Sequence, residues 1–343
     1  MGIGGADVTN VALIGAGNWG KNLLRTLHQM KGAELSTCCD ADLERCRNNL
    51  NGFQGITITG DPEDVFNNDA VSAVVIATPV PTHFDLARRA IEAGKDVMVE
   101  KPMTLSLEDA ETLVATAQKH DRVLMVGHLL EYHPCVVKMK ELLDEGELGK
   151  PYYMYSQRLN LGRIRKDENA LWSFAPHDIS IILHILDMEP ESVSARGAAY
   201  VRSNVEDVVF LDMRFPGGVV AHIHVSWLDP HKVRRTTLVG SKKMVVFDDM
   251  EPAEKVRIYD KGVEPNGRFV GYAESLSLRF GEVIVPAIAM REPLRMECEH
   301  FLECVRERKA PRSDGRDGLR VVRVLDAAQR SLKSGGQPID LAG

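Results

Sequence analysis

The sequence predicts two domains of different class: an α/β domain with a doubly wound parallel sheet, then an α+β domain with an open-faced, mostly antiparallel sheet. From residue 8 to about 125, strand-like and helix-like segments alternate, which is typical of parallel sheets. Beyond residue 127, strand signals follow one another without crossover helices, which is typical of antiparallel sheets. We therefore predict domains over 1–127 and 128–343, with C-terminal helices able to pack back on the first domain.

The first domain begins with a strand, a tight turn and a helix. An apolar run over 11–14 leads into Gly15-x-Gly17-x-x-Gly20, and a helix-like segment follows over 21–28. Gly15 permits the sharp turn, Gly17 leaves the backbone open to a pyrophosphate, and Gly20 lets the helix press on the strand. The pattern predicts a dinucleotide site. The residues that we assign to its loop are Gly15, Gly17, Asn18, Trp19 and Gly20.

A second strand-like run over 34–40 ends in Asp40, twenty positions after Gly20. At this distance a carboxylate accepts hydrogen bonds from the adenosine ribose hydroxyls and repels a 2′-phosphate, so NAD is favoured over NADP. Arg45 and Arg47 follow closely and can soften that preference. The alternative is that Asp40 only caps the helix that begins near Leu43.

The remaining elements follow from apolar periodicity and turn residues. In the first domain we expect strands over 74–77, 96–100 and 122–126, and helices over 81–93 and 107–120. In the second we expect helices over 134–146 and 176–186 and strands over 152–160, 192–201, 208–215, 219–227, 236–239, 244–248 and 256–260. Pro216-Gly217-Gly218 predicts a hairpin turn, and the tail predicts helices over 296–309 and 318–333.

Composition excludes several classes of function. The chain has 343 residues, 44% of them hydrophobic, and a net charge of −7 without a long basic run, which argues against nucleic acid or an anionic membrane as partner. It has neither a signal-peptide pattern at its start nor a run of 18 apolar residues. Six cysteines without Cys-x-x-Cys spacing indicate reduced thiols, so we predict a cytoplasmic protein. His222 and His224 share one strand face without further ligands nearby, so we expect no metal site.

Glu100-Lys101-Pro102 follows a predicted strand at its C-terminal end, where open α/β sheets bind ligands. Removing a hydride from a secondary alcohol requires that the hydroxyl proton be taken or its charge stabilised, and a lysine can do either. Glu100 can accept hydrogen bonds from the nicotinamide ribose, and Pro102 stiffens the turn. The alternative is an ordinary surface lysine in a strand-to-helix loop.

These motifs, with Ala77-Thr78-Pro79, His83 and the tail segments 297–304 and 311–315, resemble the glucose–fructose oxidoreductase, inositol dehydrogenase and MocA family. The resemblance covers nearly the whole chain. It implies a Rossmann domain, an open-faced sheet domain, a tightly held nicotinamide cofactor and a sugar or cyclitol substrate. It also implies that Lys101 is the catalytic lysine, that Thr78, Pro79 and His83 line the cofactor, and that Glu100 holds its ribose.

The family places Asp-x-x-x-His on the first helix of the second domain. His177 occupies the histidine position here, but Ser173 stands where the aspartate is expected. The resemblance implies that His177 is the acid/base and meets Lys101 at the carbinol over the nicotinamide ring. The neighbouring Asp178 can supply the missing charge. The alternative is that His177 only caps helix backbone.

Three further segments, 127–134, 158–165 and 172–177, are similar to a narrower group of nucleotide-sugar 3-dehydrogenases that act on UDP-N-acetylglucosamine or its uronate. Arg163 and Arg165 suit a pyrophosphate, although a solvated loop is the alternative for both. Asn160 can read a sugar hydroxyl or acetamido group, and Tyr132 or Trp172 can stack on a ring.

The resulting hypothesis is an NAD-dependent dehydrogenase that oxidises the 3-hydroxyl of UDP-N-acetylglucosamine, in the biosynthesis of 3-amino sugars of lipid A or surface polysaccharide. Within the fold, the alternatives are the uronate, or inositol or another free sugar, as substrate. An alternative of another class is a non-catalytic NAD-binding regulator. Because bare apolar sheets such as the one carrying 219–225 invite association, we expect a homodimer or homotetramer through the C-terminal sheet.

Overall fold

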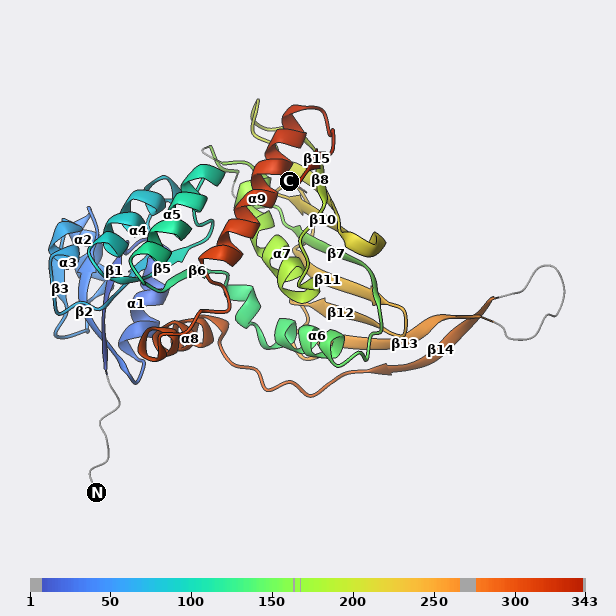
Figure 1. The fold of residues 1–343 in the computed structure, drawn as a ribbon, viewed down its shortest axis with the longest axis horizontal. Helices are drawn as coiled ribbons and strands as arrows, with labels where there is room; N and C mark the ends of the chain where they lie inside the picture. Colours follow the sequence, from blue (N-terminus) through green and yellow to red (C-terminus); the bar gives the residue numbers. More distant parts are fainter. Residues whose placement is uncertain (1–7, 163, 167, 266–275, 342–343) are drawn as a thin grey trace, which may run out of the picture. The chain divides into compact units, whose positions relative to one another are not determined.

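The computed structural model describes residues 8–162, 164–166, 168–265 and 276–341. The chain forms two compact units, and each unit takes residues from two separate stretches (Figure 1). The first unit comprises Met1–Tyr132 and Arg291–Arg323, and the second comprises His133–Met290 and Val324–Gly343. Over the described ranges, every helix is too short or too polar to cross a membrane.

The first unit is built on a parallel sheet of six strands in the order β3-β2-β1-β4-β5-β6. This is the order of a doubly wound dinucleotide-binding sheet, as predicted. Its central strands are buried on both faces, which is why they appear in the sequence as continuous apolar runs. The strands are β1 (Thr9–Ile14), β2 (Ala33–Cys39), β3 (Thr57–Thr59), β4 (Ala73–Ile76), β5 (Asp96–Glu100) and β6 (Leu124–Gly127).

Helices cover both faces of this sheet and form two apolar cores. One core takes residues from α1 (Gly20–His28), α2 (Leu43–Asn49) and α8 (Pro293–Glu307). The other takes residues from α3 (Glu63–Phe66), α4 (His83–Glu92), α5 (Leu107–Lys119) and the first turns of α9 (Gly315–Lys333). Short 3₁₀ turns, η1 (Val80–Thr82) and η2 (Leu129–Tyr132), follow β4 and β6.

The C-terminal segment 291–323 is part of the first unit, and its residues 313 and 314 lie beside the edge strand β6. The N–H of Val126 donates to the carbonyl of Ser313 at 2.8 Å, and Met125 forms an isolated antiparallel bridge with Asp314. Phe301 and Leu302 of α8 are buried in the first core. Residues near position 315 therefore lie beside residues near position 127.

The second unit carries a sheet of nine strands in the order β14-β13-β12-β11-β7-β10-β9-β8-β15. All neighbours are antiparallel except β7 and β10, so the predicted mostly antiparallel sheet is confirmed. The strands are β7 (Pro151–Leu159), β8 (Ser192–Ala198), β9 (Val208–Arg214), β10 (Val220–Ser226), β11 (Val233–Gly240), β12 (Met244–Asp248), β13 (Val256–Pro265), β14 (Leu276–Ile284) and β15 (Ile339–Asp340). The predicted hairpin turn is a 3₁₀ turn, η3 (Pro216–Gly218), in which both glycines have positive φ.

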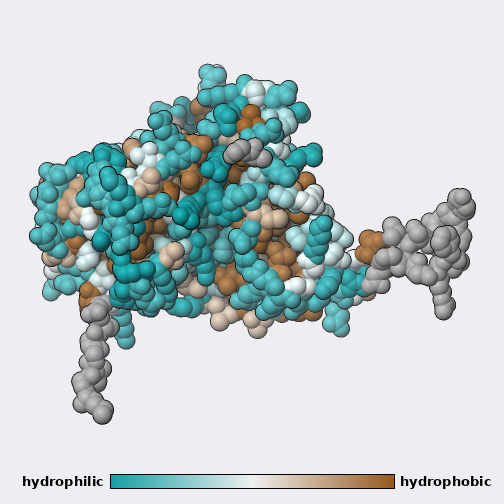
Figure 2. Space-filling view, viewed as in Figure 1, coloured by the Kyte–Doolittle hydropathy of each residue, from teal (hydrophilic) through white to brown (hydrophobic). Residues whose placement is uncertain are grey.

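One face of this sheet packs against α7 (Ala170–Leu186), and α6 (Pro134–Asp144) packs beside α7. On the opposite face, aromatic side chains pair across strands, as Phe210 stacks on His224 with ring centroids 4.4 Å apart. The histidines at 222 and 224 lie on this face, where His222 pairs with Asp212. Figure 2 shows further apolar surface on the arm formed by β13 and β14, where Leu278 and Phe280 are exposed.

Beyond shifts at element ends, the prediction shortens one helix and omits β14 together with the short elements β3, α3 and β15. The helix predicted over 176–186 begins six residues earlier, because Asn169 caps it by accepting a hydrogen bond from the N–H of Trp172. Pro176 therefore lies inside α7, although a proline usually marks the first turn. The strand β14 was not predicted, although its apolar residues Leu276, Leu278 and Phe280 alternate with polar ones in the sequence.

Candidate active site

The glycine loop has the geometry that a dinucleotide needs. A Cβ atom on Gly15, whose φ is +100°, would lie 2.6 Å from the backbone of Ala77, and one on Gly20 would lie 1.9 Å from the carbonyl oxygen of Gly15. Both glycines are therefore required by packing. Gly17 differs, because a Cβ there would meet no atom within 4 Å, which leaves open space above the backbone for a phosphate.

Asp40 contacts this loop directly. Its Oδ2 accepts from the N–H of Ala16 at 2.7 Å, and its Oδ1 accepts from the N–H of Asp42 at 2.9 Å. Arg45 lies 3.4 Å from the same carboxylate. Asp40 does not cap α2, because Asp42 accepts from the N–H of Arg45 and has that role. The two carboxylate oxygens have further lone pairs, so Asp40 can still accept a ribose hydroxyl.

Lys101 follows Glu100 at the C-terminal end of β5, as predicted. The N–H of Lys101 donates to Glu100 Oε2 at 3.3 Å, and the indole N–H of Trp19 donates to Glu100 Oε1. Although Glu100 retains some exposed surface, its carboxyl lies against the backbone of Gly127, and burial raises its pKa to about 7. Trp19 and Glu100, predicted separately, thus form one contact between the glycine loop and the end of β5.

His83 lies beneath the loops that carry the other predicted cofactor residues. It is 1% exposed, with Nδ1 3.0 Å from the carbonyl of Pro102 and Nε2 2.9 Å from that of Thr78. Burial lowers its pKa, so the imidazole is neutral and one ring nitrogen donates at a time. His83 joins the loop of Thr78 and Pro79 to the turn of Lys101, instead of lining open space.

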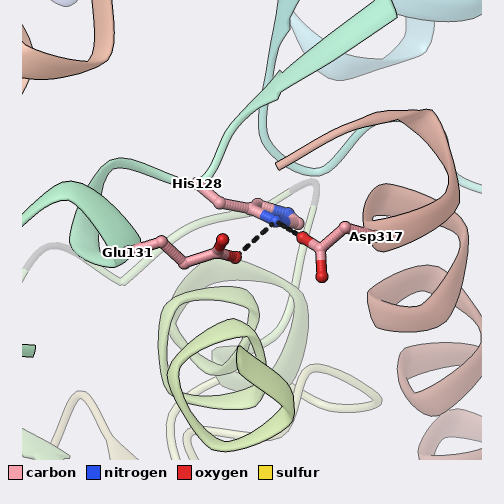
Figure 3. Close-up of side chains that lie close together, drawn as sticks. All are labelled: His128, Glu131 and Asp317. Carbon is pink, nitrogen blue, oxygen red and sulfur yellow. Dashed lines mark hydrogen bonds and ion pairs between the residues drawn. The ribbon is translucent and has the colours of Figure 1, made fainter. Parts of the chain in front are cut away.

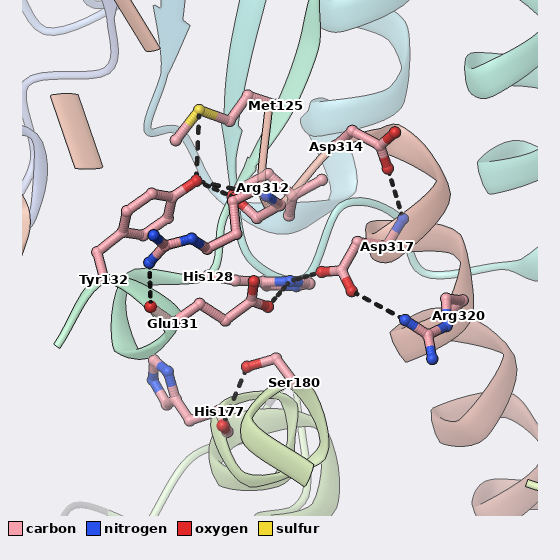
Figure 4. A network of polar contacts seen from close by, with 12 residues as sticks. Met125, His128, Glu131, Tyr132, His177, Ser180, Arg312, Asp314, Asp317 and Arg320 are labelled. Carbon is pink, nitrogen blue, oxygen red and sulfur yellow. Dashed lines mark hydrogen bonds and ion pairs between the residues drawn. The ribbon is translucent and has the colours of Figure 1, made fainter. Parts of the chain in front are cut away.

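His177 lies on α7 in the second unit, seven residues into the helix. Its backbone carbonyl accepts from Ser180 Oγ at 3.0 Å (Figure 4). Ser173 lies about one turn earlier in the same helix and is 5% exposed. A helix-capping role for His177 does not apply, because Asn169 caps α7.

The carboxylate of Asp178 forms a buried ion pair with Arg158 of β7. Arg158 donates from Nε to Asp178 Oδ2 at 2.6 Å and from Nη2 to Oδ1 at 3.2 Å, and Ser156 Oγ donates to Oδ1 at 2.6 Å. The side chains of Arg158 and Asp178 are 11% and 1% exposed. This pair joins the helix that carries His177 to the sheet. The sequence shows that Asp178 is next to His177, but it does not predict the ion pair with Arg158.

The predicted substrate residues in the second unit differ in their hydrogen bonding, and Asn160 has an available acceptor. Its side-chain oxygen is buried and accepts no hydrogen bond from the described residues. Trp172 donates from its indole nitrogen to Gln329 at 3.0 Å. Arg165 pairs with Glu168 at 2.6 Å while 52% of its side chain is exposed. Arg163 lies outside the described residues.

Tyr132 has a different role from the one expected of it. It is 2% exposed within the first core, and its hydroxyl lies 2.9 Å from Ser313 Oγ. The guanidinium of Arg312 lies over its ring, 5.0 Å from the centroid. A ring packed in this way cannot stack on a ligand, and the correction follows from the C-terminal segment that folds back over η2.

A buried cluster that we did not predict lies beside Tyr132. His128 Nδ1 is 2.7 Å from Asp317 Oδ2 and 3.3 Å from Glu131 Oε1 (Figure 3). These three residues come from the turn after β6 and from α9, and they are all buried. Their side-chain nitrogen and oxygen atoms lie within 4.8 Å of one another. A separation of 189 residues between His128 and Asp317 hides this cluster in the sequence.

The charges in the cluster follow from its contacts. Burial alone would lower the pKa of His128, but Asp317 and Glu131 raise it to about 10, so the imidazole is protonated at neutral pH. Burial alone would raise the pKa of Asp317, but the bond to His128 lowers it. Burial raises the pKa of Glu131 to about 8. Arg320 lies 3.6 Å from the other oxygen of Asp317 (Figure 4).

These observations show that the first unit fits NAD. Open space above Gly17, a carboxylate at Asp40 beside the loop, and Glu100 with Lys101 at a strand end match the phosphate, adenosine ribose and nicotinamide ribose in turn. The chemistry of the donor set is that of a dinucleotide site.

Comparison with known proteins agrees with this geometry. Residues 9–128 match the "Oxidoreductase family, NAD-binding Rossmann fold", and residues 136–246 match the "GFO/IDH/MocA C-terminal domain". A solved structure of a putative oxidoreductase from Magnetospirillum magnetotacticum is 31% identical with a TM-score of 0.80, over 94% of this chain and 99% of that one.

Several relatives have assigned activities, and two of them illustrate the range of substrates. UDP-N-acetylglucosamine 3-dehydrogenase GnnA from Acidithiobacillus ferrooxidans is 25% identical, with a TM-score of 0.80 over 95% of this chain and 98% of that one. The scyllo-inositol 2-dehydrogenase (NAD(+)) of Bacillus subtilis is 26% identical, over 82% of this chain and 81% of that one. From the matched domains and the fold, the chain belongs to the glucose–fructose oxidoreductase, inositol dehydrogenase and MocA family and is an oxidoreductase with an NAD-binding Rossmann domain.

Proposed function

We propose that this protein oxidises the 3-hydroxyl of UDP-N-acetylglucosamine to the 3-keto sugar with NAD as cofactor. The observation that carries the proposal is the likeness to UDP-N-acetylglucosamine 3-dehydrogenase, which extends over 95% of this chain. The charged form of the sugar, the uronate, is less well supported, because none of the residues that we assign to the sugar is needed to bind a carboxylate.

In this proposal the first unit holds the cofactor, which accepts a hydride from the sugar when bound. Gly17 admits the pyrophosphate, Asp40 accepts the adenosine ribose hydroxyls, and Glu100 accepts those of the nicotinamide ribose. Trp19 keeps Glu100 in place through its indole N–H. Thr78 and Pro79 complete the wall, and His83 fixes their loop from below.

Lys101 and His177 handle the hydroxyl proton. As hydride leaves the carbinol carbon, the oxygen gains negative charge, and an ammonium at Lys101 stabilises that charge or a neutral amine takes the proton. His177 acts as the acid/base partner. The Arg158–Asp178 pair supports this role through the helix, because it fastens α7 to β7 beside the histidine.

The second unit supplies the groups that recognise the substrate. The side-chain oxygen of Asn160, which accepts no hydrogen bond from the residues that the structure describes, suits the acetamido N–H or a hydroxyl of the sugar, because a buried acceptor without a donor is costly. Arg163 and Arg165 suit the pyrophosphate, and Trp172 has a ring face for stacking. UDP-N-acetylglucosamine has an acetamido group, a pyrophosphate and rings that these residues can bind, whereas inositol has only hydroxyls on its ring.

The second candidate is a cyclitol dehydrogenase, and the similarity to scyllo-inositol 2-dehydrogenase favours it. A non-catalytic NAD-binding regulator is the candidate of another class, and the presence of both Lys101 and His177 argues against it. Incubation of the protein and NAD with UDP-N-acetylglucosamine, its uronate or inositol, followed by NADH absorbance, separates them. Signal from inositol alone would overturn the nucleotide-sugar proposal, and no signal from any substrate would favour the regulator.

We also propose that the protein is a homodimer or homotetramer in which copies meet through the open face of the second sheet. The face opposite α7 carries exposed or half-exposed aromatic side chains, including Tyr153, Tyr155 and Phe210. Exposed apolar patches of this kind invite association. Light scattering coupled to gel filtration should give a dimer or tetramer, and Phe210→Glu should lower the mass to that of the monomer. A monomeric wild-type protein would contradict the proposal.

A further inference from the structure

The buried His128 lies next to the carboxylate that we assign to the nicotinamide ribose. Glu100 and Gly127 are partners in the parallel ladder of β5 and β6. A Cβ on Gly127 would lie 3.1 Å from the Glu100 carboxyl, so that carboxyl rests on the glycine backbone. His128 is the next residue, and it acts electrostatically on Glu100. The end of β6 therefore brings a histidine to the cofactor carboxylate.

His128 is held in place from two sides. Its Nδ1 donates to Asp317 at 2.7 Å and lies 3.3 Å from Glu131, and the side chain is 1% exposed (Figure 3). Asp317 is itself fixed at the start of α9, where its N–H donates to Asp314 Oδ1 at 2.9 Å. Arg312 donates to the carbonyl of Glu131 at 2.6 Å (Figure 4). The imidazole therefore has a fixed position.

We propose that His128 is a positioning residue for the cofactor: its buried imidazolium, clamped by Asp317 and Glu131, holds Glu100 in the ionised form that receives the nicotinamide ribose. The proposal rests on the proposed contact of Glu100 with that ribose. It also explains why a charged cluster lies so deep in the first unit, at the junction of the C-terminal segment and β6. A buried charge is costly unless it is paired, and His128 is paired with Asp317.

The electrostatic balance around Glu100 supports this role. Burial raises the pKa of Glu100 to about 7, and Trp19, Lys101 and His128 each act to lower it. Without His128, one of the positive charges that lower the pKa of Glu100 would be missing. The charged and titratable groups around Glu100 and the His128 cluster include Lys101, His128, Glu131, Glu297, Asp317 and Arg320.

Glu297 of α8 provides the matched control. It is fully buried, its two carboxylate oxygens make no hydrogen bond within the described part of the chain, and burial followed by repulsion from Glu100 raises its pKa well above the ordinary value. Burial therefore favours the neutral, protonated form of Glu297. Replacing it with glutamine keeps its shape and its lack of charge.

The test measures NAD affinity against pH by quenching of tryptophan fluorescence in the full-length protein. Ribose hydroxyls donate to the ionised carboxylate, so affinity rises as Glu100 loses its proton. For a group that titrates at about 7, the affinity of the wild type should increase about tenfold from pH 6 to pH 8. In His128→Gln the midpoint should move upward, because a neighbouring positive charge is lost. In Glu297→Gln the midpoint should stay in place.

A purely structural role for His128 would lower affinity equally at every pH and leave the midpoint unmoved, which would overturn the proposal. A downward shift in Glu297→Gln would also contradict it, because Glu297 would then be charged. Glu100→Gln distinguishes a failure of the positioning role of His128 from a failure of the ribose contact of Glu100. If it abolishes the pH dependence while His128→Gln leaves the midpoint unmoved, the ribose contact stands and the positioning role fails. If the pH dependence survives in Glu100→Gln, the ribose contact itself is wrong.

Should His128→Gln not fold, the wild type alone can still overturn the proposal. With ¹⁵N-labelled histidine, one of the eleven histidine side chains should remain an imidazolium at pH 8.5, well above the usual histidine range. A spectrum in which all eleven are neutral at that pH would overturn the proposal.

Discussion

Loss of the carboxylate of Asp178 should destabilise the second unit strongly. In Asp178→Asn the side chain keeps its shape but loses its charge, and Arg158 remains buried with 11% of its side chain exposed. Two charged hydrogen bonds, at 2.6 and 3.2 Å, are weakened or lost. Hydrogen bonds to charged groups contribute about 1.5–3 kcal/mol each, and removing one partner of a buried ion pair costs about 3–5 kcal/mol. We therefore expect a loss of about 3–5 kcal/mol in the free energy of unfolding.

Urea denaturation measures this loss, because two of the three tryptophans, Trp172 and Trp227, lie in the second unit and report its unfolding. Asp212→Asn is the matched control: it removes the same charge from β9 of the second unit, but its side chain is 62% exposed, so the change should stay within about 0.5 kcal/mol. NAD affinity should be unchanged, since the pair lies in the second unit. A loss below about 1 kcal/mol in Asp178→Asn would refute the reasoning.

The double variant Asp178→Asn, Arg158→Met tests the cause of the loss. If the cost comes from an uncompensated buried cation, removing that cation should restore part of the stability. Additive losses in the double variant would mean that packing, and not charge, accounts for the effect.

Three further predictions concern ligands. Asp40→Ala should weaken NAD binding by about tenfold or more without improving NADP binding, measured by fluorescence titration; tighter binding of NADP than NAD to the wild type would contradict our assignment of Asp40. Lys101→Ala should lower kcat by about a hundredfold or more in the NADH assay while NAD still binds, and unchanged turnover would remove the proposed mechanism. UDP alone, at about a hundred times its Kd, should stabilise the protein by about 2.7 kcal/mol and raise Tm in a thermal shift assay, whereas inositol should not; no shift with UDP would contradict the nucleotide-sugar proposal.

Local sequence pattern was sufficient for most of the fold. The parallel strands could be predicted because strands buried on both faces, such as Ala73–Ile76, leave a continuous apolar run. The glycine loop could be predicted because its φ angle and its close approaches demand glycine at particular positions. Helix α7 was predicted too short, because Pro176 resembled a first-turn proline and the cap at Asn169 was overlooked.

The parts that escaped prediction depend on tertiary closure. The stacking role expected of Tyr132 did not take account of Ser313 and Arg312, which reach it only when the C-terminal segment folds onto β6. The pairing of His128 with Asp317 has the same origin. Asp178 was expected to assist His177, but alternate residues of β7 bring Arg158 and Ser156 to it from the sheet. Local spacing carries no signal for contacts of this kind.

The central claim is that the carbon bearing the 3-hydroxyl of the sugar gives its hydrogen to the cofactor. It is tested most directly with UDP-N-acetylglucosamine that carries deuterium at C3, incubated with NAD and the wild-type protein at comparable concentrations. We predict that mass spectrometry of the reduced cofactor will show one deuterium per molecule formed, and that Lys101→Ala will form little of it. Reduced cofactor without deuterium, or none at all while inositol is oxidised, would contradict the account.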